Sequence, residues 1–302
     1  MQLKKLNVGG QAVIEGVMIR GPEKYTVAAR KKQGIVFKTG NIPSRKNNFL
    51  RMPFVRGFIN LADMLIIGTK SLMWSAEEAA GNKDKITKRD VTFAFLLSIA
   101  AVIVFFIALP YLLTNLTGLT EEKKPVMFNL IDGMIRIAIF LIYIISISFM
   151  KDVRRLFEYH GAEHKAIHCY EKGKKLTVEN VKGFTTLHPR CGTSFLLIVF
   201  IVSILVFSIL PSLLSFYFPA FAGAGFWTRK SILFPARILL IPVVAGISYE
   251  ILKMSDKRQK SFLFKAISIP GLLLQKITTK EPSYRQIEVA IASLKKLLEI
   301  EK

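Results

Sequence analysis

The chain has 302 residues, of which 51% are apolar, and its 43 Lys and Arg outnumber its 21 Asp and Glu. These proportions exclude a collagen repeat, a disulfide-rich scaffold, since there are only two Cys, and a disordered tail. The apolar residues gather into a few long runs with the charges between them. This distribution predicts a polytopic α-helical membrane protein with about four transmembrane helices and a small N-terminal β-rich cytoplasmic segment.

Residues 1–50 are predicted to form the β-rich cytoplasmic segment. Turn residues interrupt short β-prone runs here, which favours a small antiparallel sheet; the runs are Ala12–Ile19, Tyr25–Ala29 and Ile35–Lys38. Two charged residues, Glu15 and Arg20, stand in or beside the first run. We interpret them as one ion pair within the sheet, with the alternative that Glu15 supplies a carboxylate to a histidine cluster later in the chain.

Residues 51–90 are predicted to contain an amphipathic helix. From Phe54 to Ala80, large apolar residues recur at helical intervals among a few charges. This stretch is too polar and too interrupted to predict a span. We therefore expect a helix that lies in the membrane interface or packs on the spans.

Four runs are long enough to cross about 30 Å of hydrocarbon as helices. Two fall in residues 91–150 and two in residues 194–251; they are Val91–Leu113, Val126–Met150, Ser194–Phe218 and Ser231–Ile251. Asp132 and Arg136 lie four residues apart in the second run, on one helix face. Such charges mark a transport path or satisfy each other by pairing near the end of the span, and we favour pairing.

The positions of the basic residues predict the orientation of the spans. Lys and Arg number 17 in residues 1–90, 9 in 151–193 and 11 in 252–302, against 2 in each of 114–125 and 219–230. Since cytoplasmic segments retain these residues, both termini and the central loop are expected in the cytoplasm of a multi-pass protein of the cell (inner) membrane. The basic surface suits the lipid bilayer, and no sequence-specific nucleic-acid binding is expected.

The cytoplasmic loop of residues 151–193 holds all four histidines of the chain. If the first three lie on a helix, His160, His164 and His168 form one stripe together with Glu171. Histidines four residues apart can hold one metal ion between adjacent helical turns. Because His160 and His168 are about 12 Å apart along the helix axis, the stripe offers His160 with His164, His164 with His168, or two ions.

A zinc-type divalent ion needs a third and often a fourth ligand. The candidates near the stripe are Glu163, Glu171, His188 and Cys191. Cys169 lies about 180° from His160 on the same helix, so it is expected outside the site. Two alternatives stay open: the histidines form a polar helix face at the membrane boundary, or Cys191 and His188 form a nucleophile–base pair.

Residues 252–302 are predicted to be a basic cytoplasmic tail. After the break at Pro282, the segment Tyr284–Glu301 repeats apolar residues at helical spacing; they are Ile287, Ala290, Ile291, Leu294, Leu297 and Leu298. This pattern predicts an amphipathic helix.

Three motifs, GGQAVIEGVMIRGP, YHGAEHKAIHCYE and LHPRCGTSFLL, resemble those of the bacterial DUF1385 family of YqhQ-like membrane proteins. The resemblance covers nearly the whole chain. It implies an integral membrane protein of a kind described as predicted metal-dependent enzymes, and it implies no substrate. It points to His160, Glu163, His164, His168, His188 and Cys191. Glu15, Arg20 and Arg190 lie in the same motifs and are further polar candidates.

These residues favour two classes of function. The first is a metal-dependent, hydrolase-like enzyme at the cytoplasmic face, in which Glu163 or Glu171 accepts a proton. The second is a non-enzymatic membrane scaffold or membrane-protein biogenesis factor, whose basic cytoplasmic face meets a protein partner such as a ribosome or translocon. A third hypothesis is a transporter that uses Asp132 and Arg136.

Overall fold

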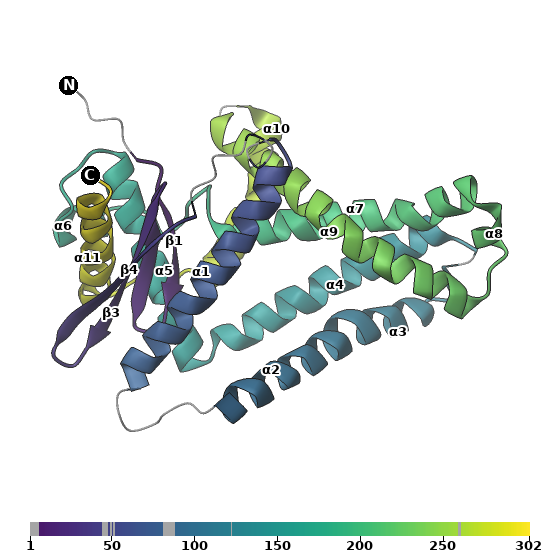
Figure 1. Ribbon diagram of the computed structural model, residues 1–302, viewed down its shortest axis with the longest axis horizontal. Helices are drawn as coiled ribbons and strands as arrows, with labels where there is room; N and C mark the ends of the chain where they lie inside the picture. The colour runs from purple at the N-terminus through teal and green to yellow at the C-terminus, as the bar shows by residue number, and fades with distance from the viewer. Residues whose placement is uncertain are drawn as a thin grey trace.

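The computed structural model describes residues 6–43, 48, 50, 52–80, 88–121, 123–258 and 261–302. Within these residues, a small sheet and the helices around it form one end of the molecule, and long helices extend from it (Figure 1). The predicted mostly helical fold with an N-terminal antiparallel sheet is confirmed.

The sheet is a meander of four described strands that pair in chain order, β1 (Gly9–Val13), β2 (Gly16–Arg20), β3 (Lys24–Lys31) and β4 (Gly34–Asn41). The run predicted over Ala12–Ile19 is divided between two strands, because the chain reverses at Ile14 and Glu15 and Val13 pairs with Gly16. Glu15 adopts the left-handed conformation in this turn, with a φ of 53°.

The sheet lies between helix α1 (Val55–Ala80) and the pair α5 (Lys151–Glu171) and α11 (Tyr284–Ile300) (Figure 1). Side chains of β2 alternate between these layers: Val17 and Ile19 pack with α5 and α11, whereas Met18 packs with Ile67 of α1. The amphipathic helix predicted in the tail is confirmed as α11, and its apolar stripe is buried in the first of these cores.

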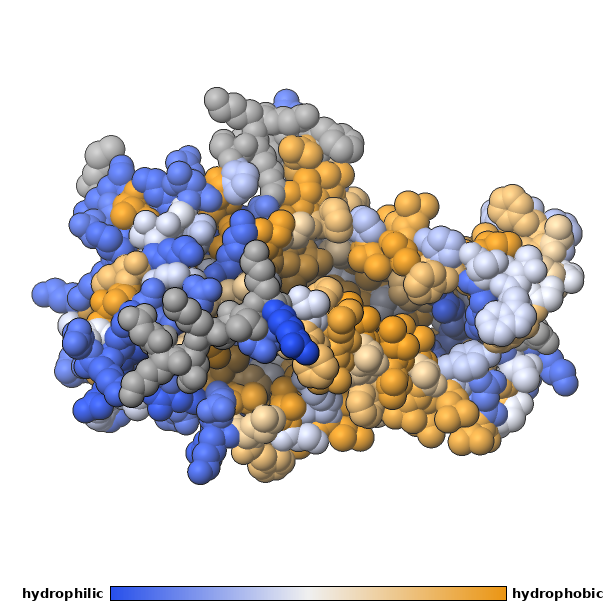
Figure 2. All heavy atoms as spheres, turned by 60° about the horizontal axis from the view of Figure 1, so that its bottom comes forward, coloured by the Kyte–Doolittle hydropathy of each residue, from blue (hydrophilic) through white to orange (hydrophobic). Residues whose placement is uncertain are grey.

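Four helices of the described chain are long and apolar enough to cross a membrane. They are Thr92–Asn115, Pro125–Ser148, Gly192–Tyr217 and Phe226–Ser255, close to the four predicted runs. The first joins α2 (Lys88–Ile103), the π-helical η3 (Val104–Ala108) and α3 (Leu109–Asn115); the others are α4 (Pro125–Ser148), α7 (Gly192–Tyr217) and α9 (Phe226–Lys257). Figure 2 shows hydrophobic side chains over these helices and hydrophilic ones around the sheet.

The charges inside the second apolar helix are paired. Arg136 Nε donates to Asp132 Oδ2 at 2.7 Å, which confirms the predicted i, i+4 pair. Arg237 of α9 donates to Asn129 Oδ1 of α4 at 2.8 Å and pairs with Glu121 before α4. The Asp132–Arg136 pair therefore lies beside polar contacts that join α4, α9 and the preceding loop, as expected for charges that are satisfied within a helix bundle.

Three further described helices complete the fold. α6 (Val178–Lys182) lies between α5 and α7, and α8 (Pro219–Ala222) between α7 and α9. Helix α10 (Phe262–Thr278), which the sequence patterns did not predict, packs on α7 and α9 within the basic tail. Helix α1 packs along α9, where a Cβ on Gly246 would lie 2.6 Å from the carbonyl oxygen of Phe54.

Candidate metal centre

Helix α5 presents the predicted histidine stripe. The ring centroids of His160 and His164 lie 4.4 Å apart, one helical turn from each other. The chain between α6 and α7 returns over the helix, so that His188 packs on His168 with a centroid distance of 4.4 Å. His188, one of the candidate ligands from the sequence, thus lies against the histidine stripe.

Among the described residues, two sets of three side chains could hold a metal ion, with ligand atoms within 4.8 Å of one another. The first group is His160, His164 and Cys191, and the second group is His168, Glu171 and His188. The two-ion alternative and the pairing of His160 with His164 are both compatible with this arrangement. The two groups differ in the hydrogen bonds that their imidazole nitrogens make.

In the first group, both imidazoles have one nitrogen bonded to a backbone carbonyl. His160 Nδ1 lies 2.9 Å from the carbonyl oxygen of Thr278, and His164 Nδ1 is bonded to that of Thr186. A carbonyl only accepts, so each Nδ1 carries the proton and each Nε2 keeps its lone pair. This partner arrangement is typical of metal-ligating histidines, whose outer nitrogen is held by a carbonyl or carboxylate.

Cys191 supplies the third donor atom. Its Sγ lies 3.2 Å from His160 Nε2 and 3.0 Å from Thr193 Oγ1. Burial raises the pKa of the Cys191 thiol and lowers the pKa of His164 well below its ordinary value, so the Cys191 thiol and the His164 imidazole are neutral without an ion. The alternative in which Cys191 pairs with His188 is not the arrangement seen, because His160 is the imidazole beside the thiol.

The side chains of the second group bond to one another and to the loop. His188 Nδ1 accepts the backbone N–H of Arg190 at 3.2 Å, so the hydrogen on Nε2 faces Glu171 Oε2 at 3.3 Å. Glu171 also pairs with the Arg190 guanidinium, and His168 Nε2 donates to the carbonyl of Leu187 at 2.8 Å. His188 has no ring lone pair to offer an ion in this arrangement, and the second group acts as a brace between α5 and the loop.

Glu163 lies beside the first group. Its Oε2 is 3.4 Å from His164 Nε2, its side chain is buried, and burial raises the pKa of Glu163 to about 8. The backbone N–H of Gly10 in β1 donates to this carboxyl group. A Cβ on Gly10 would lie 2.9 Å from Glu163 Oε1, so the glycine permits the strand to approach the acid.

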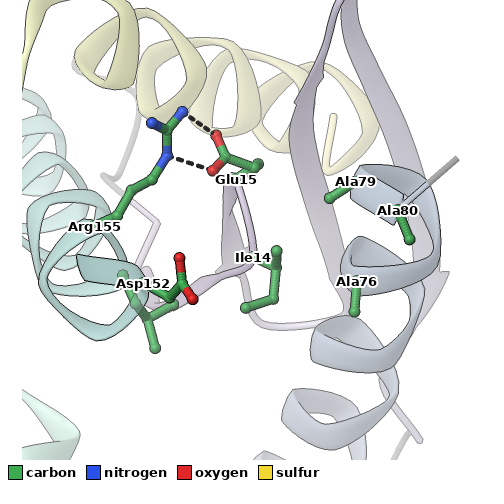
Figure 3. A pocket seen from close by; sticks show the side chains of 8 residues that line it. Ile14, Glu15, Ala76, Ala79, Ala80, Asp152 and Arg155 are labelled. Carbon is green, nitrogen blue, oxygen red and sulfur yellow. Dashed lines mark hydrogen bonds and ion pairs between the residues drawn. The ribbon is translucent and has the colours of Figure 1, made fainter. Parts of the chain in front are cut away.

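The N-terminal polar candidates lie elsewhere. Glu15 pairs with Arg155 of α5 and accepts the hydroxyl hydrogen of Tyr159 at 3.2 Å, at a cavity of about 430 Å³ that also meets α1 (Figure 3). Arg20 pairs with Asp63 of α1 at 3.4 Å. The expected Glu15–Arg20 pair is therefore replaced by two pairs between the sheet and its helices, and Glu15 belongs to neither group.

Cys169 lies on the opposite side of α5 from the histidines. It is buried in the core with α11, and its thiol faces the carbonyl oxygens of Lys174 and Lys175. The prediction that Cys169 lies outside the site is confirmed by this placement.

Gln275 of α10 holds the loop of the site and was missed by the sequence patterns. Its side chain is buried, its Oε1 accepts the His188 N–H at 2.7 Å, and its Nε2 donates to the His188 carbonyl and to Ser194 Oγ, each at 2.8 Å. An uncharged amide directly after the apolar run Leu272–Leu274 was the available signal. Its partners are 81 and 87 residues away, which no local pattern reveals.

Replacing Gln275 by leucine is expected to destabilise the loop around His188. The change leaves the buried N–H and carbonyl of His188 without these partners, at a cost of roughly 2–4 kcal/mol. Thermal unfolding of the full chain in detergent measures this loss. Lys276→Leu, an exposed position on the same helix, is the matched control and is expected to change stability little. Equal transitions for the two variants would contradict the role of Gln275.

Fold and site together define a helical protein with four candidate membrane spans, a small antiparallel sheet and a histidine and cysteine cluster where these parts meet. The chain belongs to the DUF1385 family, described as "Protein of unknown function (DUF1385)", which matches residues 52–300. It is 34% identical over 309 residues to "Uncharacterized protein YqhQ" of Bacillus subtilis (strain 168), covering 97% of this chain and 92% of that protein. No solved structure matches it.

Proposed function

We propose that the protein is a metal-dependent, hydrolase-like membrane enzyme whose first group holds one divalent ion at the cytoplasmic face. One observation carries the proposal: two imidazoles are held by backbone carbonyls at Nδ1, which directs both Nε2 atoms toward the Cys191 sulfur. Two nitrogens and one sulfur suit zinc or a similar transition metal.

Three protein ligands leave a fourth position for water or substrate, as in catalytic rather than structural zinc sites. An ion held there would polarise an oxygen of the substrate and lower the pKa of a water molecule at the open position. Glu163 is the proposed proton acceptor, because its Oε2 lies beside His164 in a buried position and the charge of an ion held there would lower its raised pKa and favour the carboxylate. Glu171, the other predicted acceptor, is engaged by Arg190 and His188.

Location in a membrane is supported by the four apolar helices and by the distribution of basic residues around them. Cys191 directly precedes α7, one of these helices, so the first group lies at the end of a candidate span. The basic residues of the central loop assign this end to the cytoplasm, and both termini with it.

A scaffold or biogenesis factor is the second candidate function. It is favoured by the second group, in which His188, Glu171 and Arg190 join α5 to the loop without needing an ion. Under this proposal the first group is a further structural link, and the basic cytoplasmic face binds a protein partner such as a ribosome or translocon.

The variant Glu163→Gln separates the two functions. In an enzyme, it is expected to retain the metal and lower the hydrolysis of a chromogenic phosphate ester by at least about 100-fold, because the proton acceptor is lost. Glu158→Gln is the matched control on the same helix, since its amide oxygen can still accept from Gln286. Activity of Glu163→Gln equal to that of the control, with metal bound in both, would favour the structural role.

A further inference from the structure

A second cavity, of about 520 Å³, opens beside the first group. It lies between β1, α1, α5 and the ends of α7 and α9, and His160, Cys191 and Thr193 form one part of its wall. Its volume falls within the range of about 300–1,000 Å³ that is usual for small-molecule sites. The side chains that would hold the ion therefore face a space large enough for a ligand.

The rest of the wall is mostly apolar, apart from Gln11, Asn60, Arg190 and Tyr249, and it reaches the outside of the molecule. Leu65 and Leu72 of α1 and Leu196 of α7 line the cavity, and they are 61%, 38% and 46% exposed. Leu196 is in the first turns of one candidate span, and Leu252 near the end of another also lines the cavity. The mouth of the cavity is thus apolar at the level where these two helices would leave the bilayer.

Charge distinguishes the inner part of this cavity from its mouth. Of the described residues that line it, none is Asp or Glu, whereas the basic residue Arg190 is present. The Arg190 guanidinium is 32% exposed although it pairs with Glu171. A bound divalent ion would add positive charge at the same place. These features favour an anionic group next to Cys191 and an aliphatic chain toward α1.

We propose that this cavity binds an anionic phospholipid of the cytoplasmic leaflet, with its phosphate headgroup at Arg190 beside the first group and one acyl chain between α1 and α7. The inference names the substrate class of the proposed enzyme and rests on that function. A lipid fits better than a free phosphate, because the apolar wall is continuous with exposed apolar side chains.

The test uses the full chain in vesicles that contain phosphatidylglycerol with a photoreactive acyl chain. Crosslinked peptides are expected from α1 around Leu61–Leu72 and from α7 at Phe195 and Leu196. Leu61→Trp fills the cavity and is expected to lower this labelling about fivefold, the effect of about 1 kcal/mol of overpacking. Met73→Trp, exposed on the same helix and outside the cavity, is the matched control.

The headgroup is tested with the same photoreactive chain on phosphatidylcholine. The wild-type protein is expected to prefer the anionic probe about fivefold, as one basic residue contributes near a membrane surface. Arg190→Gln is expected to remove the preference and Arg190→Lys to restore it, which a purely structural role of Arg190 would not do. Equal labelling by both probes in wild type, or equal labelling of Leu61→Trp and Met73→Trp, would overturn the proposal.

Metal content measured in the same samples separates this inference from the proposed function. Labelled cavity peptides in protein without metal would support the lipid site and contradict the proposal of a metal-dependent enzyme. Bound metal together with labelling confined to α2 and α4 would contradict the lipid site and would still support the metal centre.

Discussion

Protein purified without a histidine tag and incubated with zinc is expected to hold one ion per chain, and His164→Gln is expected to lose it. The variant removes one of three ligands but keeps a polar side chain of similar length near the Thr186 carbonyl. Loss of an outer-shell partner alone lowers metal affinity about 10–100-fold, and loss of a ligand is expected to exceed that. Elemental analysis and a competition titration measure the change.

The matched control is His168→Gln, one turn further along the same stripe. His168 belongs to the second group, where His188 has no ring lone pair to offer, so this variant is expected to retain the ion. Thermal transitions of the metal-free proteins establish that both variants are folded. Retention by His164→Gln and loss by His168→Gln would move the metal centre to the second group. Absence of metal from folded wild-type protein would contradict a metal centre in either group.

Gly161→Ala is expected to destabilise the protein although alanine is the better helix former by about 1 kcal/mol. Gly161 lies within α5 where the chain between α10 and α11 crosses it, and a Cβ there would overlap the carbonyl oxygen of Lys280. The Lys280 N–H donates to the Phe157 carbonyl at 2.9 Å, so this crossing is bonded to the helix. Separating the two backbones is expected to cost about 2–3 kcal/mol.

Two measurements follow this change. Unfolding in detergent gives the loss of stability, and exchange of the Lys280 amide hydrogen gives the loss of local protection. Because His160 Nδ1 bonds to Thr278 in the same crossing segment, metal affinity is expected to fall with it. Gly183→Ala is the control, since its Cβ would meet only the Asn180 carbonyl oxygen at 3.7 Å. Equal stability of both variants would show that the crossing segment can move away from the added Cβ without loss of stability.

The periodic features were predicted correctly because they depend on neighbours in sequence. Runs of apolar residues indicate the four long helices, and the i, i+4, i+8 spacing places the three histidines on one stripe. The Asp132–Arg136 pair follows from the same spacing. Features that depend on distant partners were not predicted: Glu15 pairs with Arg155, 140 residues away, and Gln275 reaches His188.

The sequence by itself determined which residues are available to the site: four histidines and Cys191 in a single loop, and a helix that aligns three of the histidines. It left open which of them could share an ion. Tertiary structure decided this, because carbonyls of Thr186 and Thr278 direct the lone pairs of His164 and His160, while the Arg190 N–H engages that of His188. Ring orientation is set by these hydrogen-bond partners, which lie 2 to 118 residues away along the chain and meet only on folding.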